Sequence, residues 1–321
     1  MLQAHIPSET SRRVVILGTG GTIAGRASQA SDNVGYTAAQ LGVDQLVAAI
    51  PALAGQALEA EQVAQLDSKD MDFAAWQRLA QRLAEHLARP EVAGVVVTHG
   101  TDTLEETAYF LQQVLAPFKP VVLTAAMRPA TALQTDGPQN LLDAVALARE
   151  PGARGVLTVF AGAIHGAEQV RKVHSYKVEA FASAEGGQLG VVEEGRVRCF
   201  GAWPQGQALG LASIVRPAAE WPRVMLLWNH VGADGALVRA LLDHPTQRPH
   251  GLVVAGTGNG TLATDLEAAL REAQASGVRV LRSTRCDAGP VMDLPGALPS
   301  AGALSPVKAR IRLLLDLLAE M

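Results

Sequence analysis

Two apolar segments, each running into a loop of glycine and threonine, constrain the fold of this chain most. The first segment, residues 14–17, opens into a loop at 18–25, and the second, residues 95–97, opens into a loop at 98–103. Short uninterrupted apolar runs are typical of strands buried in a parallel sheet. Ligands of such sheets bind beyond the carboxyl ends of the strands. We therefore expect an α/β fold whose site includes these two loops.

Apolar runs and amphipathic helices alternate along most of the chain, which predicts a mostly parallel sheet flanked by helices. The expected strands lie at residues 14–17, 63–66, 94–98, 121–124, 155–160, 224–228, 251–255 and 278–282. The expected helices lie at residues 76–87, 104–115, 139–149, 235–243 and 262–275, and from Ser305-Pro306 to the end, while residues 188–200 predict a hairpin.

The same pattern predicts two domains. A larger, Rossmann-like catalytic domain is expected at residues 1–200 and a smaller α/β domain at residues 223–321. Residues 201–222 hold several prolines and glycines and show little periodicity, so we interpret them as the interdomain linker.

The loop at 18–25 does not fit a dinucleotide-binding loop, although its glycines would let backbone N–H groups approach a ligand. Ile23 stands where the third glycine of Gly-x-Gly-x-x-Gly is needed, and no Gly-Lys-Ser/Thr follows. What remains is a threonine hydroxyl, Thr22, at the end of the first strand. Thr101, beside Asp102, stands at the end of the second. Capping of the next helix is the alternative role for this second pair.

These loops resemble the motifs of the bacterial L-asparaginase and glutaminase-asparaginase family. The two matching motifs are Gly20-Gly21-Thr22-Ile23 and His99-Gly100-Thr101-Asp102-Thr103. Further similar stretches are Ala126-Met127-Arg128-Pro129, Asp136-Gly137-Pro138 with Asn140-Leu141, Val170-Arg171-Lys172, Gly256-Thr257-Gly258-Asn259-Gly260 and Arg282-Ser283-Thr284-Arg285. The resemblance extends from residue 14 to the end of the chain.

The resemblance implies an amide hydrolase with two sets of catalytic residues. Thr22 with Tyr36 forms one set, and Thr101 with Lys172 and Asp102 forms the other. It also implies that Thr22 forms an acyl-enzyme that water releases, and that Lys172 tunes Thr101 and the proton path.

Tyr36 lies near the end of a long polar segment, residues 26–37, which we expect to act as a lid over the site. A disordered surface loop is the alternative, but an aromatic residue argues against disorder. The resemblance supports the lid, because the family carries a tyrosine on a mobile active-site loop.

The residues alone leave the base open. His99 is the one histidine in a threonine motif, but side chains alternate where a strand ends, so we expect it to point away from its neighbours and to be structural. The other solution is a lysine made neutral by desolvation, for which Lys172 is the candidate. A solvated charge beside Arg171 is the alternative for Lys172, and only the resemblance favours the catalytic role.

The resemblance also implies the groups that hold an amino-acid substrate. Asp102 would accept hydrogen bonds from the ammonium, and Ser68 with the N–H groups of its loop would hold the carboxylate, a plain turn residue being the alternative. Backbone groups at Gly100 and Ala126 complete the set. Lys69 departs from the family, which has an uncharged or acidic residue here, and is expected to pair with the substrate carboxylate or to lie in solvent.

Two further departures lie near the end of the chain. Thr261 replaces an asparagine that secreted relatives carry after Gly-Asn-Gly. The glutamate that those relatives send into a neighbouring subunit's site has no clear counterpart, and Asp287 and Asp293 are the nearest acids. These changes affect the expected substrate preference and rate more than the type of reaction.

Composition excludes several other classes of protein. A net charge of −4 over 321 residues argues against a nucleic-acid partner. No uncharged run reaches the roughly 18 residues that a membrane span needs. The first 13 residues lack the apolar segment of a secretory signal, so we expect a cytoplasmic location. Cys199 and Cys286 match no metal spacing and are expected to be small core residues. We expect no metal or organic cofactor, because no histidine, cysteine or acid cluster has ligand spacing.

The resemblance therefore implies an L-asparaginase, which converts L-asparagine and water to L-aspartate and ammonia, with L-glutamine as a poorer substrate. It also implies a homo-oligomer, a dimer of dimers with sites between paired subunits. Two alternatives stay open. One is the amidase subunit of a tRNA amidotransferase, and the other is a catalytically idle small-molecule-binding protein on the same scaffold.

Overall fold

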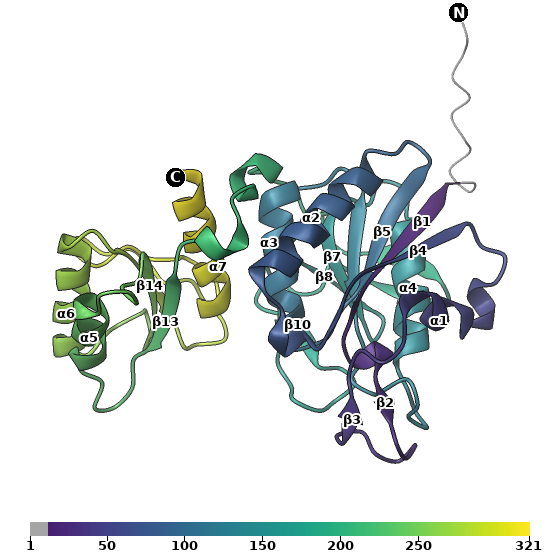
Figure 1. Cartoon of the computed structure of the whole chain (residues 1–321), viewed down its shortest axis with the longest axis horizontal. Helices are drawn as coiled ribbons and strands as arrows, with labels where there is room; N and C mark the ends of the chain where they lie inside the picture. Colours follow the sequence, from purple (N-terminus) through teal and green to yellow (C-terminus); the bar gives the residue numbers. More distant parts are fainter. Residues whose placement is uncertain (1–11) are drawn as a thin grey trace, which may run out of the picture. The chain divides into compact units, whose positions relative to one another are not determined.

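The computed structural model describes residues 12–321, and the chain divides into two compact units (Figure 1). One unit ends at Leu211 and the other runs from Ala212 to Met321. The division falls within residues 201–222, whose role as a linker stays a prediction.

The first unit is built on an eight-stranded sheet with the order β12-β11-β8-β7-β6-β5-β1-β4. The strands are β1 (Arg13–Gly20), β4 (Leu58–Leu66), β5 (Val92–Thr98), β6 (Pro120–Thr124), β7 (Gly155–Phe160), β8 (Ala163–Gly166), β11 (Gly190–Glu193) and β12 (Arg196–Cys199). Strands β4, β1, β5, β6 and β7 run parallel, and β8, β11 and β12 extend the sheet with antiparallel pairs. The predicted α/β fold with a mostly parallel sheet is confirmed.

Four helices cover this sheet, with α2 and α3 on one face and α1 and α4 on the other (Figure 1). Their bounds are α1 (Val43–Ala48), α2 (Phe73–Leu87), α3 (Leu104–Leu115) and α4 (Gly137–Ala148). The Asp72 carboxylate caps α2 by accepting a hydrogen bond of 2.7 Å from the N–H of Ala75. Trp76 of α2 stacks on Phe110 of α3 with 4.6 Å between ring centroids, which joins the two helices.

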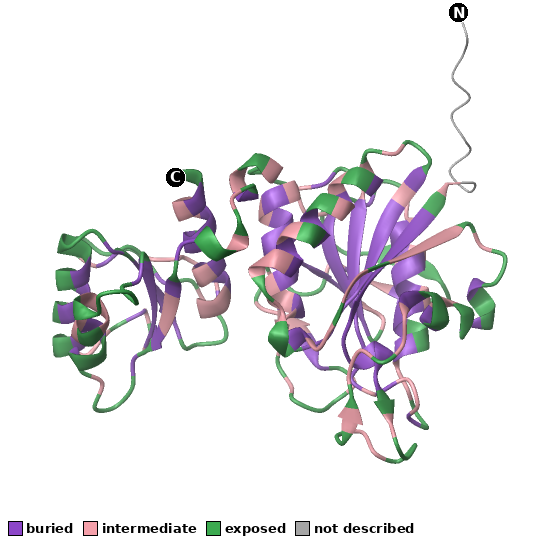
Figure 2. Cartoon of the chain, in the orientation of Figure 1, coloured by how far each residue is buried: buried purple, intermediate pink, exposed green. Residues whose placement is uncertain are grey.

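The buried residues concentrate in the central strands, which are purple in Figure 2. Val95, Val96 and Val97 of β5 have no exposed surface, as their uninterrupted apolar run predicted. Because α4 and the strands share one apolar core, the carboxyl ends of β1, β5 and β6 are held rigidly relative to one another.

The second unit is a smaller sandwich of three layers. Its parallel sheet has the order β13-β14-β15, formed by β13 (Val224–Trp228), β14 (Gly251–Gly256) and β15 (Arg279–Thr284). Helices α5 (Ala236–Asp243) and α6 (Thr264–Ala275) cover one face, and α7 (Pro306–Ala319) covers the other (Figure 1). These elements lie where the sequence predicted them.

Several elements differ from the expectation. The strand expected at 63–66 is the longer β4, which lies at the edge of the sheet. The polar segment 26–37 starts and ends as a short antiparallel pair, β2 (Arg26–Ala27) and β3 (Tyr36–Thr37), rather than as a loop throughout. A further pair, β9 (Val170–Lys172) and β10 (Phe181–Ser183), was not predicted.

The prediction that both cysteines are core residues is wrong. Cys199 and Cys286 are free thiols and both are exposed. Cys199 ends β12, the strand at the sheet edge, and Cys286 follows β15, so neither lies in a packed interior.

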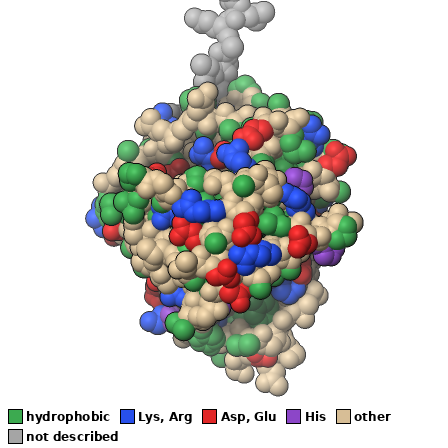
Figure 3. All heavy atoms as spheres, turned by 90° about the vertical axis from the view of Figure 1, so that its left-hand side faces the viewer, with side chains coloured by type: hydrophobic (Ala, Val, Ile, Leu, Met, Phe, Trp, Pro, Cys, Tyr) green, Lys and Arg blue, Asp and Glu red, His purple; other side chains and the backbone are tan. Residues whose placement is uncertain are grey.

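Charged side chains of both signs are interspersed over the face seen in Figure 3. No helix within residues 12–321 combines the length and the apolar character needed to cross a bilayer. Across the same described residues, histidine, cysteine and acidic side chains form no group of three that could hold a metal ion.

Candidate active site

Four neighbouring parallel strands end at one edge of the large sheet, and each is followed by a residue named from the sequence. Thr22 follows β1, Thr101 follows β5, Ser68 follows β4 and Ala126 follows β6. The strand order β6-β5-β1-β4 puts the two threonines in the middle of this row. The structure therefore brings these residues to the edge where ligands of open α/β sheets bind.

Thr22 and Tyr36 form a direct pair. Their hydroxyl oxygens lie 2.6 Å apart. Thr22 is 7% exposed and begins a single 3-10 turn after Gly21, which has a φ of 80° that favours glycine. Tyr36 comes from β3, and burial raises the pKa of its phenol. A buried threonine hydroxyl thus contacts a tyrosine that remains protonated at neutral pH.

Thr101, Asp102 and Lys172 form a second group. The Lys172 ammonium donates hydrogen bonds to Thr101 Oγ1 at 2.8 Å and to Asp102 Oδ1 at 2.6 Å. Thr101 is buried, and the Lys172 side chain is only 17% exposed, whereas the Asp102 side chain is 55% exposed. Since the ammonium has no acceptor capacity, the Thr101 oxygen accepts this bond and its own hydrogen is free to point elsewhere.

Lys172 reaches this group from β9, far along the chain. Its backbone N–H donates to Glu105 Oε1 at 3.2 Å, which ties β9 to the first turn of α3. Sequence reasoning missed this role of Glu105; the acidic start of the helix was the signal present.

Glycines allow the loops of the two sets to touch. A Cβ on Gly21 would lie 2.4 Å from Gly100 Cα, and a Cβ on Gly100 would lie 2.4 Å from Ser68 Oγ. Real Cβ atoms do not approach so closely. The first turn, the second loop and Ser68 therefore pack against one another only because these positions lack side chains.

Ser68 is 2% exposed and bonded to the Thr101 loop. Its Oγ accepts from the N–H of Asp102 at 3.3 Å, and its carbonyl accepts from Thr103 Oγ1 at 2.8 Å. Lys69, next in the chain, is 61% exposed, and its ammonium is paired with Asp70. The geometry favours the second of the two roles expected for Lys69, a solvated side chain, and its contact with substrate stays a prediction.

His99 lies under the loop, as predicted, and is fully buried. Its Nδ1 lies 2.8 Å from the Gly100 carbonyl oxygen, so Nδ1 donates, and Nε2 accepts from Thr107 Oγ1 at 3.0 Å. Burial lowers the pKa of His99 to about 4, with the Gly100 bond opposing. A neutral histidine with both nitrogens occupied is a structural residue and not the base.

Ala126 lies in the turn after β6 and is fully buried. It packs with Ile23 and Ala24, the two residues after Thr22. Asp136 and Asn140 hold this turn through hydrogen bonds, a role that the sequence did not reveal although both belong to a matched motif.

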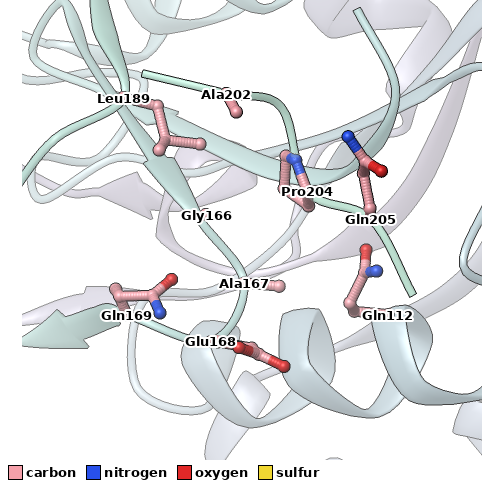
Figure 4. A pocket seen from close by; sticks show the side chains of 9 residues that line it. All are labelled: Gln112, Gly166, Ala167, Glu168, Gln169, Leu189, Ala202, Pro204 and Gln205. Carbon is pink, nitrogen blue, oxygen red and sulfur yellow. The ribbon is translucent and has the colours of Figure 1, made fainter. Parts of the chain in front are cut away.

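A separate cavity of about 130 Å³ lies between α3, the turn after β8 and residues 202–205 (Figure 4). Gln112 of α3 faces it, and the Gln112 Oε1 atom accepts from the N–H of Val156 at 2.8 Å. Neither threonine set contributes to its lining, so this cavity is not part of the candidate site.

Comparison with known proteins matches residues 13–205 to the asparaginase N-terminal model and residues 223–320 to the glutaminase/asparaginase C-terminal domain. The chain is 36% identical to a glutaminase-asparaginase of Pseudomonas fluorescens biotype A over 93% of this chain and 84% of that protein. It is also 36% identical to L-asparaginase 2 of Escherichia coli K12 over 95% of this chain and 88% of that protein. The structure is similar to that of a probable cytoplasmic L-asparaginase from Campylobacter jejuni, with a TM-score of 0.89, 37% identity and 95% of each chain covered. The chain belongs to the asparaginase family.

Proposed function

We propose that this protein is an L-asparaginase that hydrolyses the side-chain amide of L-asparagine to give L-aspartate and ammonia. The observation that carries the proposal is the pair of threonine sets at one sheet edge. Thr22 contacts Tyr36, and Thr101 contacts Lys172, in a chain whose relatives are named for this reaction.

In the proposed first step, Thr22 Oγ1 attacks the amide carbon, and its proton moves to Tyr36 as the tyrosine hydroxyl proton moves to the leaving nitrogen. Burial raises the pKa of Tyr36, so the neutral phenol acts as a relay that accepts one proton and donates another. The carbon–nitrogen bond breaks, ammonia leaves, and an ester joins Thr22 to the acyl group.

Water then attacks the ester carbonyl and releases aspartate and Thr22. The second set is placed to assist, because Lys172 holds the Thr101 oxygen as an acceptor and leaves the Thr101 hydrogen free. That hydrogen can be donated to substrate or to water without loss of the lysine contact. Asp102 neutralises the Lys172 ammonium, which makes the charged pair tolerable at a largely buried position.

The amino-acid end of the substrate is proposed to lie beside the second set. The Asp102 carboxylate is more than half exposed, so its free oxygen can accept from the substrate ammonium. Ser68 and the N–H groups of its loop lie next to Asp102 and would hold the carboxylate, together with backbone groups at Gly100. Lys69 would contribute only if its ammonium left Asp70.

Relatives named glutaminase-asparaginase make L-glutamine the second substrate to test. The two alternatives from the sequence, an amidase subunit and an idle binding protein, gain no support. Both family regions match, and the relatives are named as asparaginases. Thr22 is in contact with Tyr36, and Thr101 is in contact with Lys172.

Ammonia release from L-asparagine and from L-glutamine by the purified chain tests the proposal. Thr22→Ala and Thr101→Ala should each remove nearly all turnover while the unfolding temperature changes little. Thr246→Ala is the matched control, because Thr246 is an exposed threonine of the second unit. Near-normal turnover in either site variant would refute the two-threonine assignment.

We also propose that the protein is a homo-oligomer, a dimer of dimers, and that it is cytoplasmic. Trp228, Val231 and Leu237 of the second unit are 53%, 102% and 58% exposed, an apolar surface that supports a protein partner. The Campylobacter jejuni structure is described as cytoplasmic, whereas a relative from Haemophilus influenzae is named periplasmic. Sedimentation of the purified chain and fractionation of the source cells test these two proposals.

A further inference from the structure

Ala126 presents two buried backbone groups with no partner. The residue is fully buried, yet its N–H and carbonyl make no hydrogen bond to any residue in the described part of the chain. Buried backbone groups are nearly always paired, and an unpaired one costs free energy. The adjoining carbonyl of Ala125, in contrast, accepts a hydrogen bond from Asn140 Nδ2.

The strand order indicates which part of the substrate these groups meet. Ser68 follows β4 and Ala126 follows β6, and the strands that carry the two threonines lie between them. If the α-carboxylate lies at the β4 end of the row, the side-chain amide extends toward the β6 end. Ala126 also packs against Ile23, the residue after the proposed nucleophile Thr22.

The Asp136 carboxylate fixes the turn that contains Ala126. Asp136 Oδ2 accepts from the N–H of Met127 at 2.9 Å, and Oδ1 accepts from the N–H of Arg128 at 2.9 Å. Burial raises the pKa of Asp136, and the bonds from Met127 and Arg128 oppose this shift. Two consecutive peptide groups are therefore anchored to one carboxylate at the start of α4.

Asn140, one turn further along α4, holds the other side of the same turn. It is 2% exposed, and its Nδ2 donates to the Ala125 carbonyl at 2.9 Å and to Asp136 Oδ2 at 3.2 Å. Its Oδ1 accepts from the N–H of Ala161, just after β7, at 3.0 Å. Bonds to both neighbours of Ala126 fix its backbone while leaving its own polar groups free.

We propose that Asp136 and Asn140 are positioning residues that aim the backbone of Ala126 at the side-chain amide of the substrate. The inference rests on the proposed function. The carbonyl oxygen of Ala126 can accept a hydrogen bond from the side-chain amide nitrogen of asparagine. In aspartate a carboxylate oxygen takes the place of that nitrogen and has no hydrogen to donate. This contact therefore distinguishes the amide substrate from the acid product.

Two isosteric substitutions test the proposal. Asp136→Asn puts an NH₂ group where one of two backbone N–H groups needs an acceptor, and Asn140→Asp puts an oxygen against the Ala125 carbonyl. Each should raise KM for asparagine about tenfold, the size expected for losing one well-placed hydrogen bond. The inhibition constant of aspartate should stay within about twofold of wild type, because that ligand makes no amide contact.

Asp143→Asn is the matched control. Asp143 lies on the same helix and is 4% exposed, but its carboxylate bonds to Gln139 and not to the turn, so both constants should be unchanged. Thermal unfolding identifies any variant that does not fold. If Asp136→Asn or Asn140→Asp fails to fold, the other of the two variants decides the result.

An unchanged KM for asparagine in folded Asp136→Asn or folded Asn140→Asp would overturn the inference. So would a parallel rise of KM and of the aspartate constant, because that result indicates general loosening of the site. Absence of asparagine turnover in the wild-type protein is a different result and would refute the proposed function itself.

Discussion

Replacement of Tyr36 by phenylalanine removes one oxygen atom and leaves the ring in place. In the folded protein that oxygen lies 2.6 Å from Thr22 Oγ1. The ring also packs closely against the backbone, since a Cβ on Gly25 would come within 2.9 Å of Tyr36 Cδ2. The substitution therefore changes the proton relay while preserving the packing of the β2–β3 segment.

The expected magnitude separates a chemical role from a structural one. A lost neutral hydrogen bond costs about 0.5–1.5 kcal/mol, which lowers a rate by at most roughly tenfold. Loss of a group that transfers a proton in the transition state costs roughly 10²–10⁴-fold. We expect kcat to fall at least about 10²-fold and the unfolding free energy to change by no more than about 1.5 kcal/mol.

The assay is steady-state ammonia release, with urea denaturation of the same preparations. Tyr176→Phe is the control, because Tyr176 packs its ring under the Arg128 guanidinium at 4.1 Å and that contact does not need the hydroxyl. A fall in kcat of tenfold or less for Tyr36→Phe would refute the relay and leave Tyr36 as a packing residue of the β2–β3 segment.

The other predictions concern charge, protonation and close packing. Lys172→Met should lower kcat by at least about 10²-fold, yet cost about 1 kcal/mol or less of stability because Asp102 is more than half exposed; kinetics and denaturation of one sample measure both. Burial lowers the pKa of His99 from 6.5 to about 4, so the unfolded chain binds this proton more readily. Unfolding free energy should then fall by about 3 kcal/mol from this residue as pH drops through that window, and denaturation of His99→Gln across the same pH range should lack this part of the fall. Gly100→Ala should lower both kcat and stability, because its Cβ would lie 2.4 Å from Ser68 Oγ; an unchanged denaturation midpoint would contradict the packing described.

The buried parts of the fold were predictable from the sequence. The valine run of β5 predicts a buried strand, and the amphipathic pattern from Trp76 to Leu87 predicts a helix. The structure agrees with both predictions. Edge and short elements were not predictable. Strand β4 mixes polar and apolar residues without a regular period over Leu58–Leu66, and the β9–β10 pair has three residues in each strand, too few to show a period.

In the site, too, features set by neighbouring residues could be predicted from the sequence, whereas contacts between distant residues could not. The two threonines could be placed at strand ends from the residues around them, and the burial of His99 followed from side-chain alternation. The contact between Lys172 and Thr101 joins residues 71 positions apart, and spacing alone carries no signal for it. Exposure of both cysteines was missed because the tendency of cysteine to be buried is only an average, and these two lie at a sheet edge and after a strand.

The role of Thr22 as the nucleophile can be tested by peptide mapping with mass spectrometry, after rapid acid quench of the protein turning over L-asparagine. We expect a β-aspartyl ester on the peptide that contains Thr22, formed before the first aspartate is released, and no ester in Thr22→Ala. An ester on the peptide that contains Thr101, or sustained turnover by Thr22→Ala, would contradict this role.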